Sequence, residues 1–317
     1  MNAITLGRIL YVAGSVTDAS MAVKPIVMNE WGRKMLDNAQ GLSRRFDIHD
    51  ADWVPRGADG LGAKRPQEYL SNIRRATLLA DMPDRLSIYG LMFAPGFYIP
   101  THYHDIDQYL LITSGELRMG TRRLRPGHCA FMPAGNSYNV TIGRAGGSFL
   151  EFRSIPAYRT AFSPKDLQIV GPDASTEIEG WIKPPGKKGN TEFIDIESAP
   201  LVACDGFGPG DAARGIPEVV ASAARYQALH GITGDGYSMI SVVFNGAVDV
   251  PAHRQDEDKV IFVVGGEMRF DEPMEALRPG AGLFLAAGTA LNFCAGPAGV
   301  KYLELRKRPS WGTDWSL

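Results

Sequence analysis

The fold is decided by two stretches that align without a gap, "LRPGHCAFMPAGNSYNVTIGRAGGSFLEFR" at residues 124–153 and "LRPGAGLFLAAGTALNFCAGPAGVKYLELR" at residues 277–306. Both begin with Leu-Arg-Pro-Gly and end with Leu-Glu-x-Arg. Upstream, residues 99–119 align with residues 250–270, with Pro, His, two Asp, Gly, Glu and Arg in register. The chain therefore contains one unit twice, each copy of roughly 70 to 85 residues. This length is too long for a solenoid repeat and suits a small barrel domain.

Each copy carries the signals of short antiparallel strands. In the first copy, apolar runs such as "LSIYGLMF" and "QYLLIT" are separated by turns, and Gly115, Gly127 and Gly135 lie where a positive φ is expected. Helix-forming residues occur outside the repeats at residues 29–45 and 216–230, the second with Pro217 near its start. The prediction is an all-β dominated protein of two tandem barrels with a few flanking helices.

The predicted domains divide the chain near a Pro/Gly/Lys cluster, "KPPGKKGN" at residues 183–190, which is typical of an exposed connection. The first domain covers residues 1–185, as an N-terminal extension followed by a barrel core at about 84–154. The second covers residues 186–317, with a barrel core at about 235–307.

Composition and charge exclude several classes of partner. The 317 residues are 44% hydrophobic and 21% charged, with a net charge of −2, so binding to nucleic acid or to acidic membranes is not expected. Three widely spaced cysteines without a CxxC pair favour a reducing cytoplasm over a disulfide framework. No signal peptide and no apolar run of about 20 residues is recognised. The expected partners are a small-molecule substrate and a second copy of the chain, in a homodimer formed through barrel edges.

His102 and His104 stand one residue apart in "PTHYHDIDQYLLITSGELRMG", residues 100–120. On an extended strand, alternate side chains point to the same face, so the two imidazoles can bind one ion together. Imidazole is a ligand for Fe, Ni, Cu and Zn. The alternative is a pair of polar barrel residues with no metal.

The first copy resembles the cupin superfamily, through two glycine-bounded motifs. Gly96, His102, His104, Gln108 and Gly115 fall at the places of the first motif, with glutamine where the family usually has an acidic ligand. In the second motif, Gly127, Pro133 and Gly135 match, and Tyr138 stands where the family has its last histidine. With its second copy, the chain looks like a bicupin, which implies two jelly-roll (double-stranded β-helix) barrels. Proteins of that superfamily include dioxygenases, decarboxylases, isomerases, lyases and binding or storage proteins, so the resemblance does not select a reaction.

Two residues depart from that pattern. Gln108 can coordinate a metal through its amide oxygen, or it can simply hydrogen-bond a neighbour. A nearby cation would favour the ionised form of Tyr138, so its phenol can act as a ligand or as a general acid/base, or its ring can fill the barrel. Glu151 is a candidate catalytic carboxylate and a possible further metal ligand, but an ion pair with Arg153 on the same strand face is favoured.

The second copy has lost most of these side chains. His253 remains, but Gln255 replaces His104, Lys259 replaces Gln108 and Leu291 replaces Tyr138. An ammonium in the ligand ring repels a divalent cation, so this barrel is expected to hold no metal and to serve a structural purpose. An inward Lys259 needs a partner, and Glu304 is the candidate.

The leading functional hypothesis is an Fe(II)-dependent dioxygenase acting on a small anionic, chelating substrate, aromatic or enolisable. His102, His104 and Gln108 would hold the ion, while Tyr138 and Glu151 would be the catalytic residues. Mn, Ni, Zn or Cu are the alternative metals. A metal-dependent lyase or isomerase without oxygen chemistry is the second hypothesis, and a non-catalytic small-molecule-binding protein is the third.

Overall fold

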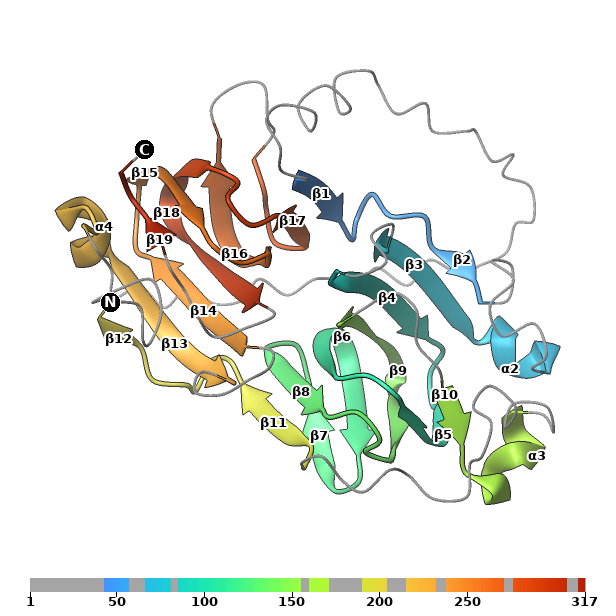
Figure 1. Ribbon diagram of the computed structural model, residues 1–317. Helices are drawn as coiled ribbons and strands as arrows, with labels where there is room; N and C mark the ends of the chain where they lie inside the picture. The colour runs from blue at the N-terminus through green and yellow to red at the C-terminus, as the bar shows by residue number, and fades with distance from the viewer. Residues whose placement is uncertain are drawn as a thin grey trace, which may run out of the picture.

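A computed structural model describes residues 43–56, 66–80, 85–154, 160–170, 190–203, 215–231, 238–270, 276–306 and 313–316. Its strands form two antiparallel sheets, each curled into a barrel, and each repeat unit builds one barrel (Figure 1). Few of its elements are helices, and these lie at the margins of the barrels. The predicted all-β architecture of two tandem barrels is therefore confirmed.

The first sheet has the strand order β11-β8-β6-β9-β4-β3-β2, with β5, β7 and β10 joined to its sides. Its elements are β2 (Val54–Pro55), α2 (Gln67–Ser71), β3 (Ile73–Leu79), β4 (Ser87–Phe93), β5 (Tyr98–His104), β6 (Gln108–Met119), β7 (Arg122–Leu124), β8 (His128–Met132), β9 (Tyr138–Arg153), β10 (Thr160–Phe162), the 3-10 helix η1 (Pro164–Asp166), α3 (Leu167–Val170) and β11 (Glu192–Asp195).

The second sheet has the corresponding order β1-β17-β16-β18-β14-β13-β12, with β15 and β19 at its side. Its elements are β1 (Ser43–Asp47), β12 (Val202–Ala203), α4 (Glu218–Ala223), β13 (Ala224–His230), β14 (Ser238–Phe244), β15 (Val248–Gln255), β16 (Lys259–Arg269), β17 (Ala281–Leu285), β18 (Leu291–Arg306) and β19 (Thr313–Asp314).

Long bent strands replace several of the short strands that the sequence predicts. β6 and β9 each run through a glycine, and their register shifts between Gly115 and Leu117. Gly115 has a φ of 69°, and a Cβ there would lie 2.1 Å from the Gly146 carbonyl oxygen. Gly127 and Gly135 also have positive φ angles, as predicted. Glycine at 115 thus lets the two strands cross at close approach, because no side chain stands between them.

The structure extends the repeat at both ends. In the first barrel α2 leads into β3, and in the second α4 leads into β13. After each barrel, a short strand returns: Thr160 of β10 lies opposite His104, and Thr313 of β19 lies opposite Gln255. The repeated unit is therefore longer than the barrel cores that the sequence predicts.

The two barrels exchange strands. β1 precedes the first barrel in sequence but pairs with β17 of the second, with Asp47 opposite Ala281. β11 precedes the second barrel but pairs with β8 of the first, with Asp195 opposite His128. Figure 1 shows β1, in blue, beside β17, in red, and β11, in yellow, beside β8, in green. Strand pairing thus crosses the predicted domain boundary at residue 185 in both directions.

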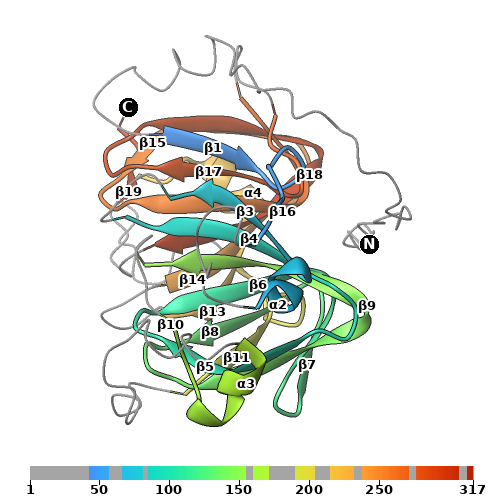
Figure 2. The same ribbon diagram turned by 90° about the vertical axis from the view of Figure 1, so that its right-hand side faces the viewer.

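A continuous hydrophobic core joins the barrels, which meet in the middle of the view in Figure 2. It forms because Ile88 of β4 and Phe152 of β9 face outward from the first barrel, whereas Leu91 and Glu151, an odd number of residues away on the same strands, face its interior. Its buried members come from both barrels and both exchanged segments: Phe46, Ile48, Leu79, Leu86, Ile88, Tyr109, Leu111, Cys129, Leu150, Phe152, Ile194, Ile196, Met239, Val260, Phe262, Phe284, Ala286, Leu303 and Leu305. The second copy therefore packs against the first, one of the structural uses that its losses suggest.

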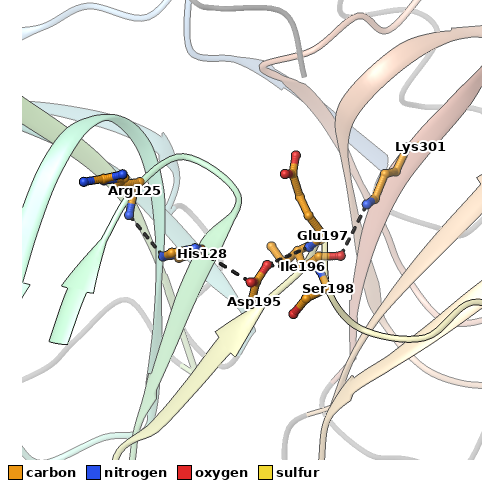
Figure 3. Close-up of polar contacts among 7 residues, drawn as sticks. All are labelled: Arg125, His128, Asp195, Ile196, Glu197, Ser198 and Lys301. Carbon is orange, nitrogen blue, oxygen red and sulfur yellow. Dashed lines mark hydrogen bonds and ion pairs between the residues drawn. The ribbon is translucent and has the colours of Figure 1, made fainter. Parts of the chain in front are cut away.

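The segment after β11 ties the barrels together through polar contacts (Figure 3). The Nδ1 of His128 accepts a hydrogen bond from the Arg125 N–H at 3.3 Å, and its Nε2 lies 4.0 Å from Asp195 Oδ2. On the other side, Lys301 Nζ donates to the Ile196 carbonyl at 3.4 Å. His128 thus has a structural position outside the barrel interior.

The helix predictions are only partly correct. Of the helix predicted at residues 29–45, residues 29–42 lie outside the described residues, and residues 43–45 belong to β1, because they pair with β17. Residues 183–189 of the predicted connection also lie outside the described residues. The predicted helix at 216–230 is α4 for six residues after Pro217 and then becomes strand β13, which pairs with β14. Tertiary pairing overrides helix propensity in both segments. Among the residues that the structure describes, no helix is long and apolar enough to cross a membrane.

Candidate functional site

A pocket lies inside the first barrel. Apolar side chains of the barrel interior form much of its wall, including Leu91, Phe93, Leu110 and Phe149. Of the predicted site residues, the pocket is lined by His102, His104, Tyr138 and Glu151. Gln108 does not line the pocket, but it donates a hydrogen bond to Tyr138, which does. The structure therefore brings the predicted residues into one barrel interior.

The two histidines lie on β5 with their rings facing the barrel interior. Their exposures are 5% and 6%, and their ring centroids are 5.1 Å apart. His102 Nδ1 lies 2.7 Å from the Pro100 carbonyl oxygen. Because a carbonyl can only accept, Nδ1 carries the proton, and Nε2 has the lone pair that a metal or a substrate proton needs. His104 Nδ1 lies 3.0 Å from Thr160 Oγ1, which holds that ring as well.

Gln108 and Tyr138 form a hydrogen-bonded pair beside these rings. Gln108 begins β6 and is 1% exposed, and its Nε2 donates to the Tyr138 hydroxyl oxygen at 2.5 Å. The Tyr138 ring centroid lies 4.4 Å from that of His102. Gln108 Oε1 is buried and accepts no hydrogen bond from any residue that the structure describes. A buried orphan oxygen is costly unless a cation or a donor occupies the space beside it.

Glu151 forms a buried ion pair with Arg153, the arrangement that the sequence favoured. Both side chains are below 5% exposed and point inward from β9. Within the described ranges, no group of three His, Cys, Asp or Glu side chains gathers around one point. The Glu151 carboxylate is thus engaged by a guanidinium, and its roles as ligand and as catalytic residue stay predictions.

The pocket residues that sequence reasoning missed include Thr160 and Phe162 of β10, and the arginines Arg56 and Arg75. The Phe162 ring centroid lies 5.4 Å from that of His102. A signal for β10 was present, because Thr-x-Phe at residues 160–162 recurs as Thr-x-Trp at residues 313–315. The arginines carry no such motif, and only the folding of β3 against β4 brings Arg75 into the pocket.

In the second barrel, the space beside the retained histidine, His253, is filled by the ring of Trp315. His253 is 1% exposed, its Nδ1 lies 3.0 Å from the Pro251 carbonyl, and its ring stacks on Trp315 with 4.5 Å between centroids. Burial, with the charge of Lys259 added, lowers the pKa of His253 to about 3, so it is neutral at physiological pH. The histidine that the second copy retains is therefore covered by an indole.

Lys259 has the partner that the sequence predicts. Its Nζ lies 3.7 Å from Glu304 Oε2, while Arg306 Nε donates to Glu304 Oε1 at 2.6 Å. All three side chains are at most 4% exposed. Burial lowers the pKa of Lys259 to about 8, because the attraction of Glu304 only partly offsets the loss of water and the repulsion of Arg306. Two cations thus share one carboxylate in the interior of the second barrel.

We expect the stability of the protein to depend on Lys259 in alkaline solution. The pKa of Lys259 is about 8 when folded and ordinarily 10.5, so the unfolded chain binds more protons between these values and stability rises with pH there. The difference corresponds to ~3 kcal/mol. Lys259→Met, which leaves Glu304 paired with Arg306, should be more stable than the wild type at pH 7.5 and lose that advantage by pH 10. Urea unfolding at a series of pH values measures this, and an advantage that stays constant with pH would contradict it.

Comparisons with known proteins bear on the fold. A scan against protein-family models and a search of curated proteins find no match for this chain. Among solved structures, a proposed dioxygenase from Nostoc punctiforme is 14% identical, with a TM-score of 0.58 over 84% of this chain and 83% of that protein. Oxalate decarboxylase from Lactobacillus farciminis, solved as a formate complex, is 13% identical, with a TM-score of 0.54 over 86% and 88%. The 11S globulin from Wrightia tinctoria is 8% identical, with a TM-score of 0.53 over 86% and 85%.

These likenesses show that the chain has the two-barrel bicupin fold. The three proteins have different functions, so the fold alone does not select a reaction.

Proposed function

We propose that this protein, with its bicupin fold, is a metal-dependent enzyme, and that its reaction is an Fe(II)-dependent dioxygenation of a small anionic, chelating substrate. The observation that carries the proposal is the pair of buried, same-face imidazoles of His102 and His104 beside the orphan oxygen of Gln108. The second barrel, which has the same fold, lacks this combination and offers a buried ammonium in place of the amide.

The donor set fits a divalent ion of the first transition series. His102 has its proton on Nδ1, which leaves Nε2 as a ligand atom, and the Pro100 carbonyl holds the ring in that tautomer. Thr160 positions His104 in a similar way. Amide oxygen can supply a third ligand, and Gln108 Oε1 has no competing hydrogen bond in the described part of the chain. Two imidazoles and one oxygen, with open positions left over, suit Fe(II) best and also accept Mn, Ni, Zn or Cu.

The charge of the donor set favours an anionic substrate. Both imidazoles and the amide are uncharged when they bind, so no protein ligand offsets the charge of a divalent ion. The Glu151 carboxylate is already paired with Arg153. A substrate with a carboxylate, enolate or phenolate oxygen would supply the missing negative charge. When bound, the ion supplies Lewis acidity and, as iron, the redox chemistry that a reaction with dioxygen needs.

The residues of this chain bind, orient and move protons. Tyr138 lies beside His102 with its hydroxyl held by Gln108 at 2.5 Å, so the phenol is placed to exchange a proton with a substrate oxygen. This one hydrogen bond orients the Tyr138 phenol and also holds the Gln108 side chain, whose Oε1 keeps no hydrogen bond to the described residues. Apolar side chains form much of the pocket wall, and a less polar surrounding strengthens these interactions. The same phenol supports the second candidate, a lyase or isomerase, in which Tyr138 moves a proton without any oxygen chemistry.

Oxygen uptake tests the proposed reaction. The whole protein, reconstituted with Fe(II) under argon, is mixed with air-saturated buffer and either a catechol or a 1,3-diketone. We expect uptake with at least one of them, and we expect Tyr138→Phe to lower kcat by about 100-fold while metal content is retained.

Three other results would replace that assignment. No uptake with any chelating phenol or diketone removes the oxygenase, and turnover with Zn or Mn in oxygen-free buffer selects the lyase or isomerase. Stoichiometric binding of a small molecule by protein that contains no metal, without turnover, would instead leave a binding protein.

A further inference from the structure

A second pocket lies between the two barrels, apart from the site in the first barrel. We call it the seam pocket, and its lining residues include Leu111, Phe262 and Lys301. Among the described residues, the two pockets have no lining residue in common. They lie on opposite faces of β6, because its side chains alternate: Leu110 lines the pocket of the first barrel and Leu111 lines the seam pocket.

Equivalent residues of the two repeat units form the apolar wall of the seam pocket. Three such pairs are Leu111 with Phe262, Pro126 with Pro279, and Ile48 with Ile196. The last pair comes from the two exchanged segments. The Ile48 N–H donates to the Gly280 carbonyl at 3.0 Å. In the same way, the Ile196 N–H donates to the Gly127 carbonyl at 2.9 Å. The seam pocket thus lies where the two units face each other, and an interface of this kind is a common place for a small-molecule site.

Lys301 of β18 is the lining residue that breaks this pairing. Its equivalent in the first unit is Ser148, because residues 277–306 align with residues 124–153. Ser148 is 4% exposed, and its hydroxyl oxygen lies 2.7 Å from those of Thr113 and Ser114. The fold therefore accepts a short hydroxyl side chain at this position and does not require a long cation. Among the described residues that line the seam pocket, Lys301 is the one with a charged side chain.

The ammonium of Lys301 is half-buried and has donors to spare. Its Nζ donates to the Ile196 carbonyl at 3.4 Å (Figure 3), which is its one hydrogen bond to the described residues. An ammonium has three N–H donors, so two remain. Burial lowers the pKa of Lys301, and its effect outweighs the attraction of Glu197 and Asp195. Both of these acidic residues are exposed, and the Asp195 carboxylate already accepts hydrogen bonds from the Glu197 and Ser198 N–H groups.

The chemistry of a ligand follows from the apolar wall and the single ammonium. Covering apolar surface with a hydrocarbon body is favourable, because it removes that surface from water. A partly desolvated ammonium with unused donors gains most from a negatively charged oxygen, since charge-assisted hydrogen bonds are the stronger ones. One ammonium suits one carboxylate. The two features together select a monocarboxylic acid with an alkyl or aryl body.

We propose that the seam pocket is a second small-molecule site, which binds a monocarboxylic acid with its hydrocarbon body between the paired apolar residues and its carboxylate on Lys301. The bound acid contacts both barrels, so it stabilises their association. This site is separate from the proposed metal centre, and it does not depend on the proposed reaction.

Calorimetric titration of the whole protein tests the seam pocket. The probes are octanoate and 3-phenylpropionate, with the amide of each as its neutral counterpart and acetate as an acid without an apolar body. We expect the wild type to bind at least one probe, and to bind the amide of that probe at least about 10-fold more weakly, because the amide cannot form a charge-assisted hydrogen bond. Acetate should also bind more weakly, because it covers little of the apolar wall.

Four variants locate the bound acid. Lys301→Ser, which introduces the residue of the first unit, should weaken binding by about 10-fold or more, and Lys301→Arg should retain much of it, because the charge is kept. Lys165→Ser removes an exposed lysine of the first barrel and should change nothing. His102→Ala should also leave the affinity unchanged, because the pocket of the first barrel takes no part.

Several outcomes would overturn the inference. These are no binding of either probe by the wild type, equal affinity for a probe and its amide, or unchanged affinity in a Lys301→Ser protein that melts like the wild type. Equal weakening by Lys165→Ser would also overturn it, since general attraction of charge would then explain the binding. Binding lost in a folded His102→Ala protein would place the acid in the first barrel. If Lys301→Ser does not fold, Lys301→Met, which keeps an apolar stem, takes its place. The titration needs neither metal nor turnover, so its failure and the failure of the proposed enzyme are distinguishable.

Discussion

We expect alanine at His102 or at His104 to abolish metal binding, and alanine at His253 to leave it unchanged. Protein purified without chelators or an affinity-tag metal should contain close to one ion per chain, and each first-barrel variant should lose at least about 100-fold in metal affinity. The physical reason is that each change removes one of two imidazoles that share an ion, and the remaining donors, Gln108 and Tyr138, are weaker ligands.

His253→Ala is the matched control for this measurement. His253 has the same contact with the preceding proline carbonyl, but its ring lies against Trp315, beside a buried ammonium that repels cations. Elemental analysis measures the metal, and circular dichroism with thermal melting verifies that the variants are folded. Metal retained by the first-barrel variants would move the site elsewhere, and metal lost from His253→Ala would show that the second barrel binds it.

The second large effect is on stability, and it follows from replacing Glu304 by glutamine. Glu304 is fully buried and is the carboxylate shared by Lys259 and Arg306. Burial by itself would raise the pKa of Glu304, but the charges of Arg306 and Lys259 outweigh burial and hold it below its ordinary value. The amide leaves two cations without a counterion in the barrel interior, so the free energy of unfolding should fall by about 3 to 5 kcal/mol.

The same charge pattern on the surface provides the control. Glu267 bonds Arg269 at 2.6 Å and lies 3.2 Å from Arg278, and these arginines are exposed. Glu267→Gln should cost at most about 1 kcal/mol, because water solvates the released charges. Adding Lys259→Met to Glu304→Gln should recover part of the loss, since one of the two unpaired cations is then gone. Equal losses for the buried and the surface variants, measured by urea unfolding, would contradict the argument.

The candidate site was largely predictable, because its key spacing is local. His102 and His104 share a face of β5 for the same reason that any two alternate residues share a strand face. Gln108 and Tyr138 could be named from their places in the cupin-like motifs, and the losses in the second copy followed from its alignment with the first. Their contact with one another could not be read from the motifs, because it depends on how β6 and β9 curve around the barrel.

The charged half of the pocket was not predictable. The sequence around Arg75 has no motif that marks it as a site residue. Arg56 and Arg75 are also far in sequence from Glu151 and Arg153. Only the pairing of β3 with β4 and of β4 with β9 brings these side chains to one end of one barrel. The helix at residues 216–230 was predicted too long for a related reason, since β13 gains its hydrogen bonds from β14, a distant partner.

The amino-acid sequence alone determined the duplicated unit, its strand content, the same-face histidines and the lysine that replaces Gln108 in the second copy. These features depend on alternation and alignment, which are properties of neighbouring residues. The tertiary structure decided the exchange of β1 and β11 between the barrels, the core that joins them and the arginines that meet the pocket. Those features depend on which distant strands pair, and strand pairing is selected by the burial and hydrogen bonding of the whole chain.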